Sequence, residues 1–566
     1  MTLDAEFDTG TLNGVNHDAP NNDQLQLNTT GSTFPVLWVA NAGEDTVSRI
    51  DTDADCEVAR YETWFSSGIH GAWNGPAPSR TAVDGEGNVF VANRHFDNRP
   101  VSVLKILSEG GIDRNGNGVI DTSADANGDC QITPDEMIPL VDGNANGILE
   151  DAELADERVA WVEQIPNTTG QLGRSLCIAG DGNLWAGTYN GHAYYELNPD
   201  NGSVLTGPIA TPGLNPYGCV VDGDGILYSA GLSNVMGVLD TNTNTFLGAL
   251  NAGSFFYGIT AGNGKIYGGS SSNLSYLQFD PNVGVGEPDG NPATGTFSTP
   301  ASVSLYSLGV GIDGNGQITV GQGSSLTKFD RDTGAVVWTT TSGSYGDVRG
   351  IVTDSNNNTW AISRDRNAVY KFDGATGNLL TTVPVGNEPY TYSDATGFAF
   401  RNTTDPFGVF TVIIDGAAGA VWDSVSWNTE PEGSIPTGAS IVVEARVADS
   451  LAGLGGATYA PATNGMTGLA LAGQFIQIRS TLRPNSAGES PVLSNLLAIT
   501  VEEGEPMACD ADNNGQIDRN DIALISAARG QSALPGDPRD LDGNGIITVN
   551  DARGCALQCT NARCAP

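Results

Sequence analysis

One pattern recurs through most of this chain: an apolar strand, a turn of the Asp-Gly-x-Gly type and a second apolar strand. Its copies are spaced by about 40 residues, which is the period of propeller blades. The full copies occupy 81–91, 176–185, 219–228, 259–267, 310–318 and 351–360, and residues 36–51 carry a copy that lacks its first strand. Residues 397–400 can supply that strand, which would close a ring of about seven blades without free sheet edges.

Across residues 35–401 this repeat resembles the NHL/YVTN-type propellers and the virginiamycin B lyase-like family. The resemblance implies a fold and leaves the activity open, because propellers host unrelated functions. The lyase pattern needs a glutamate and histidines on successive blades, and residues 217–360 contain no histidine. The chemistry of that family is therefore not expected here.

Two acidic loops near the C-terminus have the spacing of an EF-hand calcium loop. Such a loop places oxygen side chains at positions 1, 3, 5 and 12, a backbone carbonyl at position 7 and a glycine at position 6. The first loop supplies Asp510, Asp512, Asn514, Gln516 and Asp521, and the second supplies Asp540, Asp542, Asn544, Ile546 and Asp551. We predict that both bind Ca²⁺; the alternative is a pair of Asx-rich turns without metal.

A helical pattern follows each loop, and the loop–helix duplicate at about 508–558 resembles a type I dockerin. The resemblance implies a cohesin-like partner that contacts positions 10 and 11 of each loop. Those positions hold Arg519, Asn520, Val549 and Asn550, which differ from the Ser/Thr pairs of cellulosomal dockerins. The alternative is that Ca²⁺ bound in the two loops only stabilises the fold of this segment.

A second acidic segment, 111–157, contains two further complete loops and part of a third. The complete loops offer Asp125, Asn127, Asp129, Gln131 and Glu136, then Asp142, Asn144, Asn146, Ile148 and Glu153; the partial loop offers Asp113, Asn115 and Asn117. Glutamate at position 12 can bind Ca²⁺ through both oxygens. In the partial loop position 12 is Ala124, so we expect weak binding or a ligand shared from Asp121. Each complete loop is expected to lead into a short helical stretch.

Arginine and tyrosine gather at one predicted end of the ring. Aligned blades place these residues where the innermost strand begins or after the second strand: Arg80, Arg94, Arg174, Tyr217, Tyr257, Arg349 and Arg364. Guanidinium forks and tyrosine rings suit carboxylates, sulfates or sugar planes. We predict a binding site for an anionic ligand here, and the alternative is that these arginines pair with aspartates of the blade turns.

The other segments suggest a modular chain. Residues 404–504 have the longer alternating strands of a β-sandwich, acting as a spacer or as a sugar-binding domain. Residues 1–33 belong to no blade and are expected to pair with the sandwich, within the chain or in a neighbouring copy. The predicted domains are thus 1–33, a propeller at 34–403 with the 111–157 insertion, the sandwich at 404–504 and the dockerin-like module at 505–566. The fold class is mainly β with small α calcium modules.

Eight cysteines favour disulfides and an extracellular location over zinc. We predict Cys509–Cys555, Cys559–Cys564 and Cys56–Cys130. Cys177 and Cys219 lie in adjacent inner strands, either bonded or with their side chains on opposite faces. No signal-peptide pattern follows Met1, so we expect that an export signal has been removed.

The formal net charge of −41 argues against nucleic-acid partners, and the apolar runs are too short to span a bilayer. We expect a secreted or cell-surface bacterial protein that is stabilised by Ca²⁺ and functions in adhesion or assembly. Its partner would be cohesin-like or a second copy, reached through the C-terminal module or the N-terminal strand. The propeller would bind an anionic ligand, with a glycan as one candidate. The alternative is a propeller lyase or hydrolase acting on an anionic polysaccharide.

Overall fold

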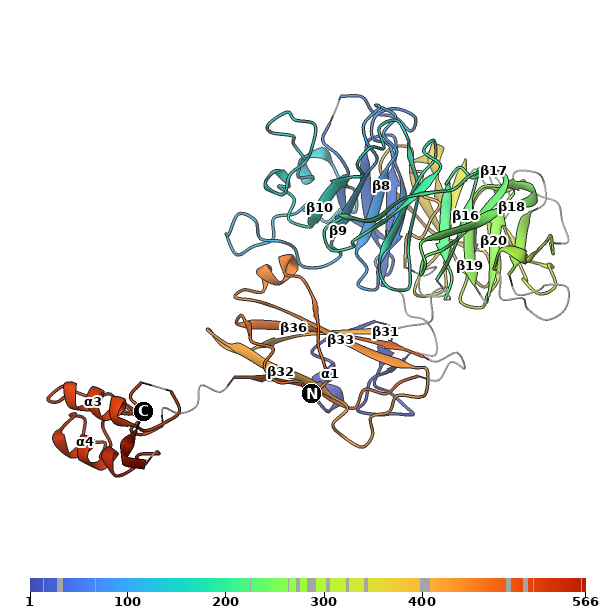
Figure 1. The fold of residues 1–566 in the computed structure, drawn as a ribbon. Coiled ribbons are helices and arrows are strands. Elements are labelled where there is room, and N and C mark those ends of the chain that lie inside the picture. The colour runs from blue at the N-terminus through green and yellow to red at the C-terminus, as the bar shows by residue number, and fades with distance from the viewer. Residues whose placement is uncertain are drawn as a thin grey trace. The chain divides into compact units, whose positions relative to one another are not determined.

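The protein is mainly β, and its strands form seven radial sheets and a sandwich (Figure 1). The computed structural model describes residues 1–566 except 14, 28–33, 67, 224, 263, 271–274, 282–291, 302–305, 322–324, 341–344, 398–407, 485–489, 502–506, 513, 561 and 566. The chain forms two compact units, Met1–Ala420 with Ser424–Ala498 and Val421–Asp423 with Ile499–Pro566. No helix among the described residues is long and apolar enough to cross a membrane.

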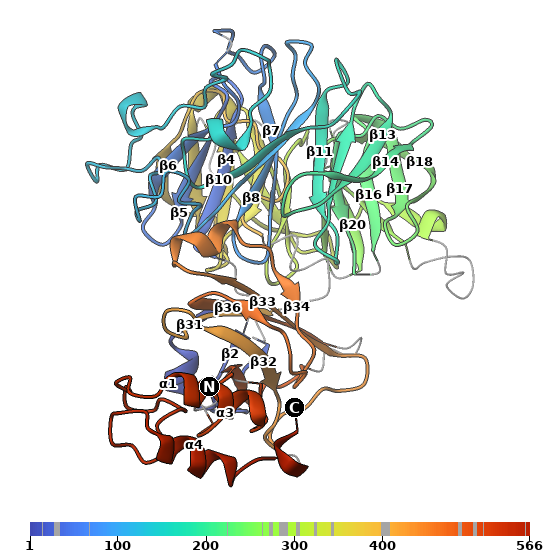
Figure 2. The same ribbon diagram turned by 60° about the vertical axis from the view of Figure 1, so that its left-hand side comes forward.

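Seven sheets make up the propeller (Figure 2). The first has three strands: β4 (Val36–Asn41), β5 (Thr46–Asp51) and β6 (Cys56–Glu62). The others have four: β7 (Pro78–Val83), β8 (Val89–Asn93), β9 (Ser102–Ile106), β10 (Val159–Gln164); β11 (Gly173–Ile178), β12 (Leu184–Thr188), β13 (Ala193–Leu197), β14 (Val204–Ala210); β15 (Gly218–Val221), β16 (Ile226–Ala230), β17 (Ser233–Asp240), β18 (Thr245–Phe256); β19 (Ile259–Gly262), β20 (Lys265–Gly269), β21 (Tyr276–Asp280), β22 (Thr296–Ser298); β23 (Val310–Ile312), β24 (Ile318–Gly321), β25 (Leu326–Phe329), β26 (Val336–Thr339); β27 (Val348–Thr353), β28 (Thr359–Ser363), β29 (Ala368–Phe372), β30 (Leu379–Pro384). Consecutive strands pair antiparallel within each sheet.

The repeated turn aspartate explains why these segments fold back as hairpins. Asp84 Oδ1 accepts the N–H groups of Glu86 and Asn88 at 2.9 and 3.0 Å. Asp313 and Asp354 accept bonds from the residues two and four positions later in the same way. Because the side chain itself satisfies the turn, each copy of the motif specifies its hairpin locally.

Polar residues close the ring. Tyr390 N–H donates to Ala40 O at 2.8 Å and Trp38 N–H donates to Ala395 O at 2.9 Å, so the chain at 389–395 lies beside β4. The closing segment thus precedes the apolar stretch at 397–400 that we predicted, of which 398–400 lie outside the described residues. Backbone hydrogen bonds and the Thr391 hydroxyl, which accepts Ala40 N–H at 2.7 Å, fasten this segment to β4, so it lacks the apolar strand pattern on which the prediction relied.

Apolar clusters fill the space between blades. Each of the seven neighbouring pairs of blades shares one cluster, including the pair formed by the first and last blades. Trp38, Trp185 and Trp360 are completely buried in these layers. Burial of this kind stabilises each interface by roughly 2 kcal/mol or more for every large side chain.

The 111–157 segment leaves the second blade between β9 and β10. Its only regular elements are two 3₁₀ turns, η1 (Pro134–Glu136) and η2 (Asp151–Glu153). The glutamates therefore end short turns, whereas we predicted that they begin helical stretches. Asp125 N–H donates to Val58 O at 2.9 Å and Leu140 N–H donates to Glu62 at 2.8 Å, which ties the segment to the first blade.

The sandwich includes the N-terminal residues. One sheet has the order β1 (Thr11–Asn13), β31 (Gly408–Asp415), β36 (Phe475–Arg483), β33 (Ser440–Ala448), β34 (Ala460–Pro461), and the other has β35 (Leu471–Ala472), β32 (Val421–Trp427), β37 (Leu496–Thr500). Strands β2 (Val15–Asn16) and β3 (Gln26–Leu27) pair with each other, and helix α1 (Asp4–Phe7) precedes them. Phe7 is fully buried, and its ring centroid lies 5.5 Å from that of Phe410.

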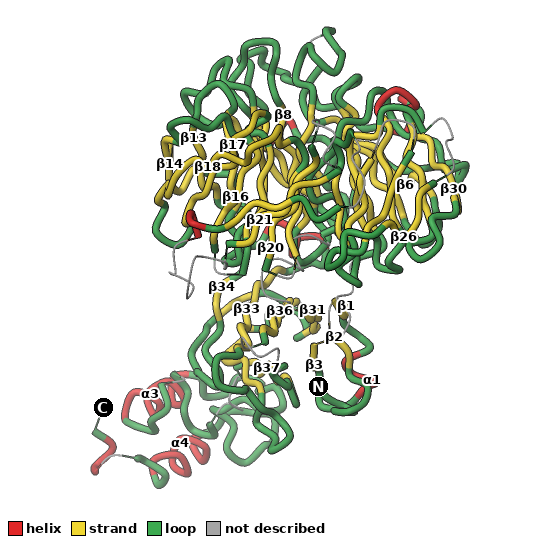
Figure 3. Tube along the Cα trace, turned by 90° about the vertical axis from the view of Figure 1, so that its right-hand side faces the viewer, coloured by secondary structure: helices red, strands yellow, loops and turns green. Residues whose placement is uncertain are grey.

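The C-terminal module holds two helices, α3 (Arg519–Ala527) and α4 (Val549–Ala556), seen in red in Figure 3. They enclose a small apolar cluster around Ile525 and Ile547. The remaining 3₁₀ turns of the protein are η3 (Pro292–Thr294), η4 (Arg364–Arg366), η5 (Ala452–Gly456) and η6 (Ala562–Cys564).

All eight cysteines form disulfides: Cys56–Cys130, Cys177–Cys219, Cys509–Cys555 and Cys559–Cys564. The three predicted pairings are confirmed, and the inner-strand pair is bonded. Four disulfides indicate an oxidising environment, since such bonds rarely persist in reducing compartments.

Candidate functional site

The first C-terminal loop brings three carboxylates together. Oxygens of Asp510, Asp512 and Asp521 lie within 4.8 Å of one another. Asp521, at position 12, is fully buried and accepts the Asp512 and Asp518 N–H groups at 3.1 and 2.8 Å. Gly515, at position 6, has φ +82° and donates to Asp510 Oδ2 at 2.7 Å. This left-handed bend favours glycine and turns the chain around the acidic centre.

The second loop repeats this arrangement. Asp540, Asp542 and Asp551 converge in the same way. Asp551 Oδ2 accepts Thr548 N–H at 2.7 Å, and Gly545, with φ +85°, donates to Asp540 Oδ2 at 2.7 Å. The two loops therefore present matching sets of oxygens.

The electrostatics of these loops fit a divalent cation. Desolvation and the neighbouring carboxylates of Asp521 and Asp510 raise the pKa of Asp512. Three like-charged groups within 4.8 Å repel one another, and a hard cation with oxygen preference reverses that repulsion. The acidic triads could thus bind a metal such as Ca²⁺.

The complete loops of the 111–157 segment use the same hydrogen bonds. Glu136 accepts N–H groups of Ala126 and Thr133, at positions 2 and 9, at 3.2 and 2.9 Å. Glu153 likewise accepts the N–H groups of Gly143 and Glu150, at positions 2 and 9, at 2.8 and 3.1 Å. A position-12 carboxylate bound to positions 2 and 9 is therefore shared by these loops and by the first C-terminal loop, where Asp521 accepts both donors.

Glu157 completes the partial loop. Its Oε1 accepts Arg114 N–H at 2.8 Å and its Oε2 accepts Asp121 N–H at 2.8 Å, which are positions 2 and 9 of the loop that begins at Asp113. Asp121 itself accepts the side-chain amides of Asn115 and Asn117 at 2.7 and 2.9 Å. Sequence reasoning proposed Asp121 as the substitute ligand, but the carboxylate in the place of position 12 is Glu157.

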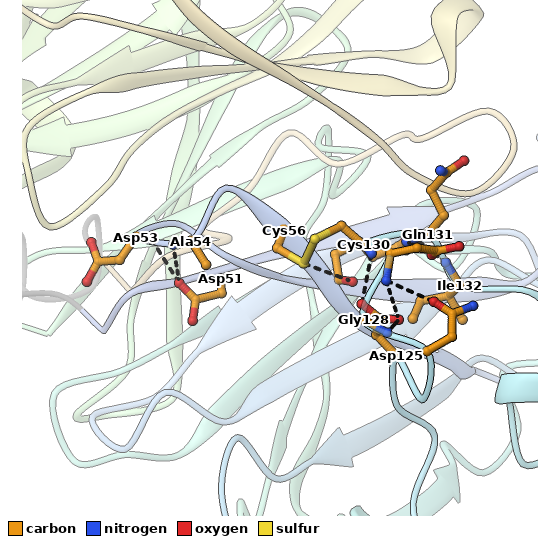
Figure 4. The surroundings of a disulfide bond; sticks show 12 residues. Asp51, Asp53, Ala54, Cys56, Asp125, Gly128, Cys130, Gln131 and Ile132 are labelled. Carbon is orange, nitrogen blue, oxygen red and sulfur yellow. Dashed lines mark hydrogen bonds between the residues drawn. A yellow bond between two sulfur atoms is a disulfide. The ribbon is translucent and has the colours of Figure 1, made fainter.

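A cysteine takes the glycine position of the loop at 125–136 (Figure 4). Cys130 has φ +63° and donates its N–H to Asp125 Oδ2 at 2.8 Å, as the glycines of the C-terminal loops do. Its sulfur is bonded to Cys56. Although Cys56, Asp125 and Cys130 lie close enough to surround an ion, the disulfide removes both thiolates as ligands.

At the propeller end predicted to bind an anion, three arginines are buried. Arg80 Nε donates to Arg174 O at 2.7 Å and Arg94 Nε donates to Ala77 O at 2.8 Å. Both Nη atoms of Arg80, both Nη atoms of Arg94 and Nε of Arg174 have no hydrogen-bond partner among the described residues. No carboxylate of the described residues forms an ion pair with any of the three. Buried cations without a counter-charge are costly.

Tyrosines surround these arginines. The Tyr390 hydroxyl lies 3.2 Å from that of Tyr217 and 2.7 Å from that of Tyr257, and the Arg80 guanidinium carbon is 3.2 Å from the ring centroid of Tyr392. Sequence reasoning found Tyr217 and Tyr257 by blade alignment. It missed Tyr390 and Tyr392 because they lie in the polar closing segment. The signal that could have found them is the presence of two tyrosines at alternate positions there.

The arginines affect the ionisation of Tyr390. Burial opposes ionisation, but the charges of Arg94 and Arg349 and the bonds from Tyr217 and Tyr257 outweigh it, so the pKa of Tyr390 lies below its usual value. A phenolate at this point would offset part of the buried positive charge.

The last two predicted residues have a counter-ion. Arg349 Nη2 lies 2.7 Å and Arg364 Nη2 3.0 Å from Asp347 Oδ2, and Arg349 Nη1 donates to the Tyr257 hydroxyl at 2.9 Å. These two arginines thus pair with an aspartate, as the alternative interpretation describes, whereas Arg80, Arg94 and Arg174 do not.

Below the tyrosines the central channel is narrow, and its lining is mainly apolar with polar side chains such as Thr260, Thr353 and Asp394. A cavity of about 50 Å³ is lined by inner-strand residues such as Ile178, Val220 and Ile259. The Cys177–Cys219 disulfide joins the inner strands of two neighbouring blades in the same lining. A ligand therefore has little room inside the ring and must approach from outside.

Three neighbouring side chains have the order of a hydrolase triad. His95 Nδ1 lies 3.0 Å from Asp97 Oδ1, and His95 Nε2 lies 2.7 Å from Ser102 Oγ. Ser102 and His95 are fully buried, and Asn93 also donates to Ser102 Oγ at 3.0 Å. Because no substrate reaches a fully buried hydroxyl, we interpret this network as structural.

Neither a family model nor a curated protein sequence matches this chain. Among solved structures, selenomethionine-substituted virginiamycin B lyase from Staphylococcus aureus is similar at 13% identity, covering 54% of this chain and 84% of that chain, with a TM-score of 0.37. BamB from Moraxella catarrhalis is similar at 14% identity (62% and 84%; TM-score 0.34), and a streptogramin B lyase structure at 12% identity (62% and 89%; TM-score 0.37). At these values no activity is transferred to this chain.

Proposed function

We propose that this protein is a secreted or cell-surface bacterial binding protein, stabilised by Ca²⁺, whose propeller binds an anionic ligand in extracellular adhesion or assembly. The observation that carries the proposal is the buried group of Arg80, Arg94 and Arg174, whose free guanidinium nitrogens lack partners among the described residues. The chain has a net charge of −41, so acidic groups are plentiful, yet these arginines form no ion pair with any carboxylate in the described part of the chain. An external anion supplies the missing charge.

Calcium has a supporting role in this proposal. Two matching acidic triads shape the C-terminal module, and further loops of the same spacing shape the 111–157 segment. Metal binding contributes directly to the stability of small modules with little apolar core. The module would keep its helices in place outside the cell, where Ca²⁺ is abundant.

The same proposal assigns attachment to a cohesin-like partner or a second copy. Arg519, Asn520, Val549 and Asn550, at positions 10 and 11 of the loops, are exposed. The N-terminal strand offers a second route, because a strand that pairs with β31 in its own chain can also pair with that strand in a neighbour. Electron microscopy with Ca²⁺ tests this part: filaments or closed oligomers support it, and single particles contradict it.

Retention on immobilised acidic polysaccharide tests the ligand. We expect retention at physiological ionic strength that neutral polysaccharide does not give. A strongly acidic protein is repelled by such a matrix unless a specific site overcomes the repulsion, so retention is informative. Passage without delay would refute the proposal, and shortened polysaccharide chains would favour the lyase or hydrolase alternative.

A further inference from the structure

One aromatic side chain lies over the buried arginines and is itself open to solvent. Trp73 is 47% exposed, and the guanidinium carbons of Arg94 and Arg174 lie 5.1 and 5.5 Å from its ring centroid. Phe96 and Tyr390 contact Trp73 edge to face at 5.9 and 5.5 Å. Two rings thus fix the tryptophan from the side and leave an indole surface available to a ligand.

The two guanidinium groups beneath Trp73 repel each other. Burial and the charge of Arg174 lower the pKa of Arg94 to about 10. Arg94 is fully buried and Arg174 is 7% exposed. The Nη atoms of Arg94 have no partner among the described residues, so its two outer donors lack an acceptor there.

The segment that carries Trp73 is bounded by glycines. Gly71 has φ +140° and Gly75 has φ +60°, and Asn74 N–H closes a turn on Gly71 O at 3.0 Å. Ala72 N–H donates to the Glu388 carboxylate, just before the closing segment, at 3.1 Å, and this bond fixes the turn. The positive φ at both positions favours glycine, and Phe96 N–H donates to Gly75 O at 2.8 Å, so the turn that presents Trp73 is fixed to the blade beside it.

We infer that Trp73, Arg94 and Arg174 form a binding site for an anionic sugar residue, with the acid group between the two guanidiniums and the sugar ring against the indole. This inference rests on the proposed function and specifies its ligand. A small inorganic anion would use only the guanidiniums, whereas the exposed indole offers an apolar plane that a ring-bearing acid covers. Carboxylate and sulfate groups both match a pair of guanidinium forks, so the shared feature is an acid group on a sugar ring.

Calorimetric titration of the full-length protein tests the site with four probes: a uronate oligosaccharide, a sulfated oligosaccharide, a neutral oligosaccharide and inorganic sulfate. We expect binding of one or both acidic sugars, and no measurable binding of the neutral sugar or of sulfate ion. Preference between the two acidic sugars identifies the acid group. Trp73→Ala and Arg94→Met are each expected to weaken binding by about tenfold or more, the effect of losing one strong contact. Arg366→Gln, which removes an exposed arginine of η4, is the matched control and should change affinity less than about twofold.

Stability provides a second readout in case Arg94→Met affects folding. Replacing a buried, unpaired cation by an apolar side chain of similar length should leave the melting temperature unchanged or raise it. A lowered melting temperature together with unchanged affinity would show that Arg94 is structural and would refute the inference. Equal binding by wild type and Trp73→Ala, or equal binding of sulfate ion and acidic sugars, would also refute it while leaving the anion-binding proposal standing. Failure of every acidic probe to bind the wild type would refute both.

Discussion

The C-terminal loops and the arginine end of the propeller both gather like charges, but they do so in opposite surroundings. The acidic triads combine buried and exposed carboxylates, and backbone N–H groups already bind their oxygens. The guanidiniums of Arg80 and Arg94 are fully buried between aromatic rings. Carboxylates near water remain solvated until an ion binds. Guanidiniums that are buried away from water are costly unless a counter-charge lies close to them. From this difference we expect the loops to depend on a bound metal for their shape, and the propeller end to be held by its own packing whether or not a ligand is bound.

Removing calcium should give the largest effect and separates the two regions. With EDTA we expect amide hydrogen exchange in α3 and α4 to become fast, because each site loses about 4 kcal/mol of binding energy at free Ca²⁺ near a thousand times its Kd. The residues from 502 onward contain no tryptophan, and all nine tryptophans lie earlier in the chain. Tryptophan-monitored melting therefore reports on the rest of the chain, where Leu140, Leu149 and Leu154 of the 111–157 segment pack in one cluster with Trp38 and Trp64, and any shift there measures the calcium loops of that segment. Continued protection of both helices in EDTA would contradict the metal assignment.

The His95 network offers a test that should act on the propeller alone. Burial lowers the pKa of His95, so the neutral ring is favoured in the folded state. Its contribution to stability is complete above about pH 6.5, the unfolded value, and is lost as pH falls toward the folded value. His95→Ala should cost about 2 kcal/mol by leaving buried partners unsatisfied, and should flatten tryptophan-monitored stability between pH 7 and 5. An unchanged pH profile would show that another group controls acid stability.

Substitution of Glu157 refines the metal side of the comparison. Glu157→Gln keeps the shape of the side chain but removes the charge that takes the position-12 place in the loop starting at Asp113. We expect the Ca²⁺ affinity of one site to fall on the order of tenfold or more, measured by calorimetry. Asp121→Asn is the matched control, and the larger loss should occur at Glu157. The reverse order would restore Asp121 as the replacement ligand.

The smallest expected effect concerns Tyr390. Because its pKa lies below the usual value, a spectrophotometric titration near 295 nm should show one tyrosine ionising before the others. Tyr390→Phe should remove that early step with little change in melting temperature at neutral pH. Arg349→Gln, which removes one of the two nearby charges, should move the step to higher pH. Persistence of the step in Tyr390→Phe would assign it to another residue.

Sequence reasoning succeeded where a structural signal is local. The turn aspartates define the hairpins because each side chain binds its own turn, as Asp84 does, and the Cys56–Cys130 bond follows from two loops that neighbouring blades bring together. It failed where the partner comes from a distant segment. The sequence near Asp113 does not indicate Glu157, which follows two complete loops. Tyr390 and Tyr392 were missed because they lie in the polar closing segment. That Arg80 and Arg94 find no acid partner among the residues whose structure is described is likewise a property of the folded protein.

The pairing of β1 with β31 has a mechanical consequence. Thr11 lies opposite Thr411 in this antiparallel pair, so the chain enters and leaves the propeller at adjacent strands. Because the strands are antiparallel, a pull on the N-terminal end of β1 and the C-terminal end of β31 acts at the same end of the pair and opens its hydrogen bonds one after another. The ring of blades would carry none of this load until the β1–β31 pair has separated. In an attached protein, this order of opening would leave the blades folded while the sandwich yields.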